Sequence, residues 1–87
     1  MANTTNTVRL IGKVTDDQGD VVENATVILR NYSDSQFDLT DERGLFDFKD
    51  VIPGKYELVV LHRKHMTIRE IIEVTTDSDI DVYAPLE

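Results

Sequence analysis

The sequence predicts an all-β protein with the fold of a seven-stranded antiparallel β-sandwich. Short segments alternate apolar and polar residues along most of the chain, which is the period of a strand with one buried face. Clusters of Gly, Pro, Asp and Ser separate these segments, at a spacing of about 8–12 residues that is typical of small sandwiches. The 87 residues are enough for one domain with one core.

The first half of the chain supplies three predicted strands. In segment 8–15 the alternation places one set of residues on the core face: Val8, Leu10, Gly12 and Val14. The turn DDQGD follows, where Gly19 can take a positive φ. In segment 25–32 the core set is Ala25, Val27 and Leu29. Segment 37–41 is short and polar, so we expect an edge strand there.

The second half supplies four more strands. After a turn at Gly44, Phe46 and Phe48 are in phase, which predicts a strand with both rings in the core. A Pro-Gly turn follows at 53–54. The next strand should bury Tyr56, Leu58 and Val60 and expose Glu57, Val59 and Leu61. Segment 66–74 fits a strand or a helix, and its β-branched residues favour a strand. The last strand alternates Ile80 and Val82 with Asp79, Asp81 and Tyr83.

The charge and composition exclude several classes of protein. Seventeen acidic residues against nine basic ones give a net charge of −8, which disfavours binding to nucleic acid or to an anionic membrane. The absence of cysteine excludes disulfides, thiolate catalysis and cysteine-ligated metals. No apolar run approaches the roughly 20 residues of a membrane span, so we expect no membrane insertion.

The start of the chain differs from the rest. Residues 1–7 are small and polar and predict a flexible N-terminal arm, whereas residues 8–87 predict a single sandwich domain. The first ten residues lack the basic and apolar regions of a signal peptide. We therefore expect that the chain acts where it is made, or that it is a piece of a longer exported protein.

Two motifs carry a family resemblance that covers roughly residues 8–82. The first comprises Gly12, Val14, Asp16, Gly19, Ala25, Val27 and Leu29. The second comprises Thr40, Asp41, Gly44, Phe46, Phe48, Pro53, Gly54, Tyr56, Leu58 and Val60. In this order and spacing they resemble the motifs of carboxypeptidase regulatory-like domains, which are transthyretin-like or Ig-like β-sandwiches. Many members have Gly-Tyr where this chain has HRKH at 62–65. The resemblance implies a module that is mostly non-catalytic.

The segment 62–65 is the first candidate for chemistry. His62 and His65 are three residues apart and could share a metal ion, but no third ligand is near and two cations lie between them. The simplest interpretation is a solvated loop. The segment is also the only dense basic cluster in an acidic chain, which fits a contact with an acidic partner surface.

Other candidate sites are weaker. The acidic stretches 16–20 and 77–81 could bind calcium, although neither follows an EF-hand loop. An internal isopeptide bond, as in a related sandwich family, would use Lys13, Glu57 and Asp79 or Asp81, but the alternation places Lys13 and Glu57 away from the core. An exposed aromatic platform for sugars would have to use Tyr32, Phe37 and Tyr83.

Enzymatic activity is not expected. Hydrolases with a transthyretin-like fold end in Tyr-Arg-Gly-Ser, whereas this chain ends in VYAPLE. No serine–histidine–acid constellation is evident. The sequence therefore predicts no catalytic residue, no metal and no cofactor.

The function that fits best is a structural or interaction module that attaches to a larger protein assembly. One form of this hypothesis is a decoration protein on the capsid or tail of a phage virion, at the virion surface. The alternatives are an accessory domain of a larger exported peptidase, transporter or adhesin at the cell surface, or a carbohydrate- or calcium-binding module. The expected partner contacts are Asn3, Thr4, Thr5, Asn6, His62, Arg63, Lys64 and His65.

Overall fold

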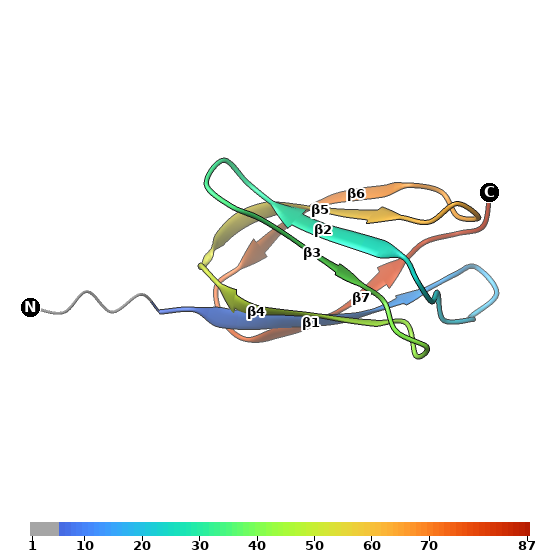
Figure 1. Ribbon diagram of the computed structural model, residues 1–87, viewed down its shortest axis with the longest axis horizontal. Helices are drawn as coiled ribbons and strands as arrows, with labels where there is room; N and C mark the ends of the chain where they lie inside the picture. The colour runs from blue at the N-terminus through green and yellow to red at the C-terminus, as the bar shows by residue number, and fades with distance from the viewer. Residues whose placement is uncertain (1–5) are drawn as a thin grey trace, which may run out of the picture.

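Seven strands form two sheets that pack face to face (Figure 1). The computed structural model describes residues 6–87. The strands are β1 (Val8–Thr15), β2 (Thr26–Arg30), β3 (Ser35–Leu39), β4 (Leu45–Val51), β5 (Gly54–Leu61), β6 (Ile68–Val74) and β7 (Ser78–Tyr83). The predicted β-sandwich is therefore confirmed, and segment 66–74 contributes a strand rather than a helix. Residues 6–87 contain no helix long and apolar enough to cross a membrane.

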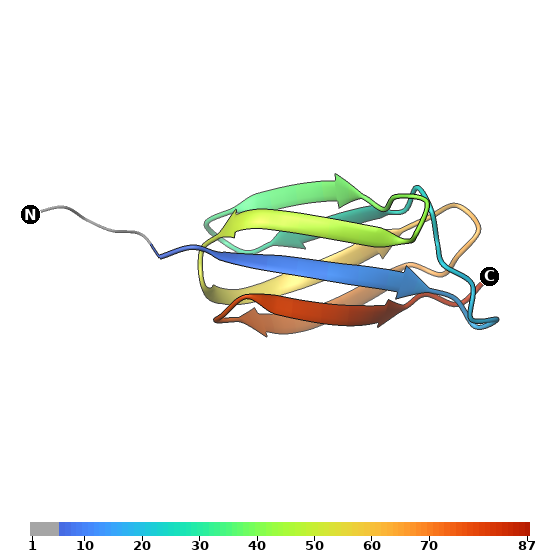
Figure 2. The same cartoon turned by 90° about the horizontal axis from the view of Figure 1, so that it is seen from below.

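The two sheets differ in size. One has three strands in the order β4-β1-β7, and the other has four in the order β3-β2-β5-β6. Strand β3 lies at the edge of the four-stranded sheet, as its short polar sequence predicted. Viewed from the side of the three-stranded sheet, β1 lies between β4 and β7 (Figure 2).

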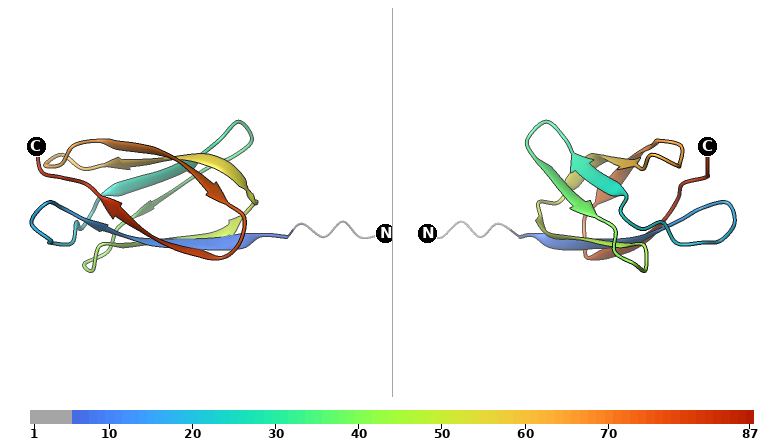
Figure 3. Two further views of the ribbon diagram at one scale, coloured as in Figure 1. Left: turned by 180° about the vertical axis from the view of Figure 1, so that it is seen from behind. Right: turned by 45° about the vertical axis from the view of Figure 1, so that its right-hand side comes forward.

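One strand pair departs from the predicted antiparallel arrangement. Four of the five pairs are antiparallel, but β1 and β7 run parallel. The chain crosses from β6 in one sheet to β7 in the other at the end of the sandwich where β1 begins (Figure 3). There the backbone N–H of Arg9 donates to Asp77 Oδ1 at 2.9 Å. Strand β7 then has to run along β1 in the same direction.

The core lies between the sheets and follows the predicted alternation. The buried cluster comprises Leu10, Val14, Val22, Ala25, Val27, Leu29, Phe46, Phe48, Val51, Tyr56, Leu58, Val60, Val74, Val82 and Ala84. One residue departs from the pattern. Val59 lies on the outer face of β5, as its phase requires, yet only 2% of it is exposed, and it does not belong to the core cluster.

Gly12 leaves room for the largest core side chain. It lies directly opposite Phe46 in the β1–β4 pair, and a Cβ at position 12 would lie 2.2 Å from Cζ of that ring. Phe46 in turn packs against Phe48, with ring centroids 5.7 Å apart. Only glycine on β1 allows the Phe46 ring to lie across the strand.

The polar residues of the second motif bond to the backbone. The buried hydroxyl of Thr40 accepts the Ala25 N–H at 2.8 Å and donates to the Val22 carbonyl at 2.7 Å. Asp41 Oδ1 accepts the N–H groups of the turn before β4. The Tyr56 hydroxyl donates to the Ile52 carbonyl at 2.6 Å. These contacts fix turns and strand ends, which is a structural role.

Candidate functional site

The described residues expected to contact a partner lie at opposite ends of the sandwich. Asn3, Thr4 and Thr5 lie outside the described residues, and Asn6 is exposed just before β1. His62, Arg63, Lys64 and His65 form the turn between β5 and β6. This turn lies beyond the end of β1, beside the C-terminal segment (Figure 1). Asn6 and the β5–β6 turn therefore lie too far apart to form one contact site.

The C-terminal segment holds the β5–β6 turn in place. The backbone N–H of Met66 donates to the Pro85 carbonyl at 2.9 Å, and that of Glu87 donates to the Lys64 carbonyl at 3.1 Å. Within the turn, the N–H of His65 donates to the His62 carbonyl at 3.0 Å. Arg63 and Lys64 remain exposed, so the turn presents these two cations on a fixed backbone.

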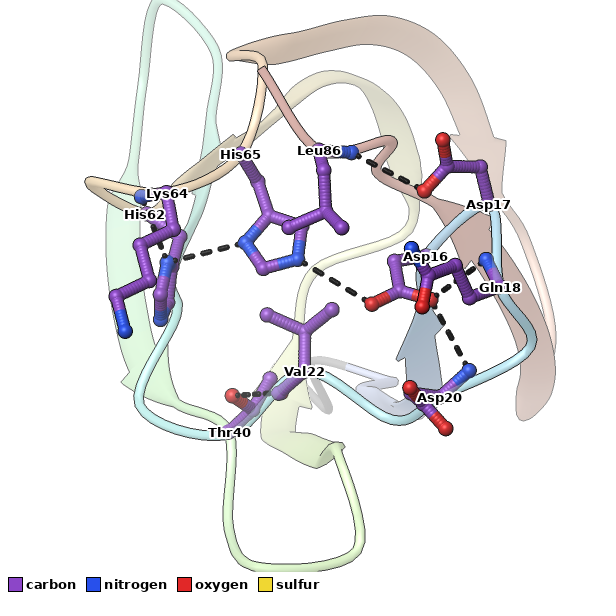
Figure 4. Close-up of polar contacts among 10 residues, drawn as sticks. All are labelled: Asp16, Asp17, Gln18, Asp20, Val22, Thr40, His62, Lys64, His65 and Leu86. Carbon is purple, nitrogen blue, oxygen red and sulfur yellow. Dashed lines mark hydrogen bonds and ion pairs between the residues drawn. The ribbon is translucent and has the colours of Figure 1, made fainter.

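His65 is buried, so the expectation of a solvated loop is wrong for this residue. Only 8% of its side chain is exposed, because the turn folds its ring inward against the end of β1 (Figure 4). Its Nδ1 lies 3.1 Å from Nδ1 of His62, and the two rings meet edge to face. Its Nε2 lies 3.6 Å from Oδ2 of Asp16, which is just beyond hydrogen-bond distance. Within the described residues this Nε2 is a buried nitrogen without a hydrogen-bond partner.

One hydrogen bond indicates which nitrogen of the His62 ring carries its proton. The backbone N–H of Lys64 donates to Nδ1 of His62 at 3.1 Å, so the ring of His62 carries its proton on Nε2. Nδ1 of His65 lies 3.1 Å from the same His62 atom, and its Nε2 faces the carboxylate of Asp16 at 3.6 Å.

Two pKa shifts accompany this arrangement. The backbone N–H of Gln18, above all, and that of Asp20 donate to Asp16 and hold the pKa of its carboxyl below the ordinary value. Burial, with a smaller contribution from His65, lowers the pKa of His62. Both shifts favour a carboxylate at position 16 and a neutral ring at position 62.

The residues considered as candidate metal ligands are not grouped around a common point in the described part of the chain. The lone pair of His62 Nδ1 already accepts a backbone N–H, so it is not free for a metal. Residues 6–87 contain no group of three or more His, Cys, Asp or Glu side chains placed to hold an ion. Oδ1 of Asp16 accepts two N–H groups of its own turn, and Asp79 and Asp81 project from the outer face of β7.

The residues considered for an isopeptide bond or a sugar platform are also dispersed. Lys13 lies opposite Asp81 on the outer face of the three-stranded sheet, whereas Glu57 lies on the outer face of the other sheet beside Arg30. Phe37 lies on the outer face of β3 and Tyr83 on the outer face of β7, so these two rings point to opposite sides.

A groove of about 700 Å³ runs beside the β5–β6 turn. Its lining comprises Glu23, Asn24, Thr26, Leu61, His62, Arg63, Lys64 and Thr67. Arg63 and Lys64 thus border a hollow with both apolar and polar walls. His65 is not part of this lining, since its ring faces the interior.

The contact between Asp16 and His65 is the feature that sequence reasoning missed. One signal for it was present: the core phase of Leu10, Gly12 and Val14 continues to Asp16, which predicts an inward carboxylate at the end of β1. Nothing local indicated that the ring at position 65 would turn inward. That orientation depends on the C-terminal segment, which pairs with the turn through a bridge between His65 and Leu86.

Comparison with known families identifies one match over nearly the whole chain. The model of the carboxypeptidase regulatory-like domain matches residues 9–87. No curated protein sequence matches the chain at a significant level.

Several solved structures share the fold at low sequence identity. The TIE protein of Bacillus anthracis matches with a TM-score of 0.77 and 16% identity, over 92% of this chain and 16% of that one. The shaft pilin SpaA of Lactobacillus rhamnosus GG matches with a TM-score of 0.75 and 12% identity, over 94% of this chain and 46% of that one. The 3-chlorocatechol 1,2-dioxygenase of Rhodococcus opacus 1CP matches with a TM-score of 0.79 and 8% identity, over 97% and 62%. The chain therefore spans less than two thirds of each structure, and the similarity concerns the fold alone.

Proposed function

Because the chain belongs to the family of carboxypeptidase regulatory-like domains, we propose that it is a non-catalytic accessory module that attaches to a larger protein or protein assembly. The observation that carries this proposal is that the residues of the family motifs make contacts inside the domain. Gly12 makes room for a core ring, Thr40 bonds to two backbone groups, and Tyr56 bonds to a backbone carbonyl. Their contacts are internal and build the fold, which leaves function to the surface.

The burial of His65 supports a role without catalysis. An acid–base group has to reach its substrate, and the ring of His65 lies inside, away from the groove beside the turn. The row of Asp16, His65 and His62 connects the end of β1 to the β5–β6 turn. Its role in this proposal is to position the turn.

The assembly that we propose first is the surface of a phage virion, where the module would decorate the capsid or the tail. The small size and the acidic surface of the chain support this narrower form. A second candidate is an accessory domain of a protein on the exterior of a cell. The match to a shaft pilin is the observation that favours it.

The contact residues proposed for this attachment are the exposed cations of the β5–β6 turn and the first residues of the chain. Arg63 and Lys64 are exposed and border a groove, which suits contact with carboxylates on a partner. His65 positions the turn from inside. Residues 2–7 are proposed as a second contact, separate from the turn.

Co-purification of the full chain tests the proposed function. An affinity-tagged chain should elute with a stoichiometric larger particle or polypeptide from the cells or virions that make it. Deletion of residues 2–7, or the double change Arg63→Glu and Lys64→Glu, should lower occupancy on that assembly without changing the unfolding temperature. A chain that elutes alone from its native source would contradict the proposal.

A further inference from the structure

The outer face of the four-stranded sheet carries apolar residues on every one of its strands. Strand pairing aligns Phe37, Ile28, Val59 and Arg69 in one row. It aligns Leu39, Thr26 and Leu61 in the row on one side, and Ser35, Arg30, Glu57 and Ile71 in the row on the other. We call these three rows the outer patch. The core alternation predicts polar residues here, so apolar residues at these positions need another reason.

Several of these apolar side chains are open to solvent. Phe37 is 72% exposed, Ile71 68%, Leu39 52% and Leu61 38%. Between them, Val59 is only 2% exposed, because Ile28 and Arg69 lie on either side of it. The outer patch therefore has a dense apolar centre with exposed apolar residues around it. Exposed apolar side chains gathered on one face of a domain are typical of an interaction site.

Hollows lie at both ends of the outer patch. The groove beside the β5–β6 turn includes Thr26 and Leu61 in its lining. A second groove, of about 550 Å³, is lined by Arg30, Glu57 and Ile71 at the opposite end, together with the hairpin residue Tyr32. The outer patch is thus continuous with the cations Arg63 and Lys64.

The charge of this side is opposite to that of the whole molecule. Five of the nine basic residues lie on the outer patch, beside it or on the adjoining turn: Arg30, Lys55, Arg63, Lys64 and Arg69. The outer faces of the same strands carry two acidic residues, Glu57 and Glu73, and a third, Glu23, lines the groove beside Arg63 and Lys64, so five basic residues face three acidic ones. Glu57 pairs with Arg30 at 2.8 Å and lies 3.9 Å from Arg69. In a chain of net charge −8, this face is locally cationic and apolar.

We propose that the outer patch is the docking surface of this module and that its partner is a protein surface with apolar side chains surrounded by carboxylates. The inference rests on the proposed function and specifies where attachment occurs. Exposed apolar side chains supply the buried centre of such an interface, and the cations at its rim select an acidic partner.

Two other occupants fit the charges less well. A two-fold pair of this chain would set the same cations against one another across the interface, because such a contact uses one surface twice. An anionic membrane would attract the outer patch, but the remaining surface of the chain is strongly acidic and would be repelled. A protein that presents its own carboxylates avoids both conflicts.

Photocrosslinking within the purified assembly tests this inference. A photoreactive phenylalanine derivative replaces Phe37 or Ile71 on the outer patch, and Leu45 or Tyr83 on the outer face of the other sheet as matched controls. Positions 37 and 71 should crosslink to a partner protein, through a peptide with several Asp or Glu residues next to apolar ones. Positions 45 and 83 should not. Crosslinks only from 45 and 83, to another copy of this chain, or to lipid would each overturn the inference.

Substitutions give a second readout. Phe37→Ser combined with Ile71→Ser should lower occupancy on the assembly by at least about tenfold, while Leu45→Ser combined with Tyr83→Ser leaves it unchanged. Both pairs alter exposed side chains, so circular dichroism should show equal unfolding temperatures. Full occupancy of the first variant would overturn the docking surface and leave the proposed function intact. The function itself fails only if the unmodified chain joins no assembly.

Discussion

The outer faces of the two sheets differ in polarity, although the strands of both sheets alternate inward and outward residues in the same way. On the three-stranded sheet the outward residues are mostly charged, and basic residues lie next to acidic ones. Arg9 pairs with Asp47 through two N–H groups, at 2.9 and 2.6 Å, and Lys13 lies opposite Asp81. On the four-stranded sheet the outward rows are rich in apolar residues. The same fold therefore has one face that water solvates well and one that a partner can cover.

The largest expected difference is in the stability lost when the central outward residue of each sheet is replaced by aspartate. Val59→Asp places a carboxylate where only 2% of the native side chain is exposed, so it should lower the free energy of unfolding by about 3 kcal/mol or more. Ile11→Asp, on the half-buried outer face of β1, should cost about 1 kcal/mol. Urea denaturation of both variants measures this. Equal losses would mean that the two faces are alike.

A glycine in each sheet gives the next comparison. Gly12→Ala forces the new methyl group against the buried ring of Phe46 and should cost about 2 kcal/mol. Gly54→Ala on β5 meets no atom closer than 3.9 Å and should change stability by less than about 1 kcal/mol in either direction.

A second-site change tests the cause of the loss at position 12. In the Gly12→Ala background, Phe46→Leu should cost less than it does in the native background, because a smaller side chain relieves the contact. Additive losses from the two changes would show that the ring of Phe46 is not what excludes a side chain at position 12.

Acid should destabilise the domain in two separate pH ranges, each set by titratable groups beside a different sheet. The pKa of His62, after β5, is lowered from 6.5 by burial, so the unfolded chain binds a proton that the native ring resists. Stability should therefore fall as pH drops below about 6.5. The pKa values of Asp41 and Asp47, around β4, are lowered from 3.8 by hydrogen bonds, so their contribution should be lost only below that value.

Single substitutions separate these two windows. His62→Gln should flatten the upper part of the stability profile, and Asp41→Asn, which keeps an acceptor oxygen in the turn, should flatten the lower part. Thermal unfolding between pH 3 and pH 8 provides the measurement. An unchanged upper window in His62→Gln would assign that window to another group.

The smallest effect concerns the ion pairs on the two faces. The Arg9–Asp47 pair uses two donors and two acceptors, whereas Arg30 directs both of its contacts to one oxygen of Glu57. A double-mutant cycle should therefore give a larger coupling for the first pair, and both couplings should shrink in concentrated salt. Couplings that do not depend on salt would argue against ion pairing as their origin.

The sequence was sufficient for the features that depend on local alternation. The core phase of β1, β2, β4 and β5 could be assigned because a strand with one buried face leaves a period of two in its own residues. The turn at Gly44 was visible for a similar reason, since its φ of 75° favours glycine.

The features that depend on contacts between distant segments could not be predicted. The burial of Val59 arises from Ile28 and Arg69 on neighbouring strands, which alternation within β5 does not report. The inward ring of His65 depends on Asp16, which is far away in the sequence, and on the C-terminal segment. The parallel direction of β7 follows from the path between the sheets. The cations of the β5–β6 turn could be named from charge alone, but not the location of that turn at the end of the sandwich opposite Asn6.

The parallel pairing of β1 and β7 has a mechanical consequence. Because these strands run side by side in one direction, β1 begins at one end of the sandwich and β7 finishes at the other. A tension that pulls the start of β1 away from the finish of β7 acts along both strands. It loads the hydrogen bonds of the six aligned residue pairs together, in shear, rather than opening them one at a time. We therefore expect this pair of strands to resist a pull along the length of the sandwich better than a pair whose hydrogen bonds open one at a time.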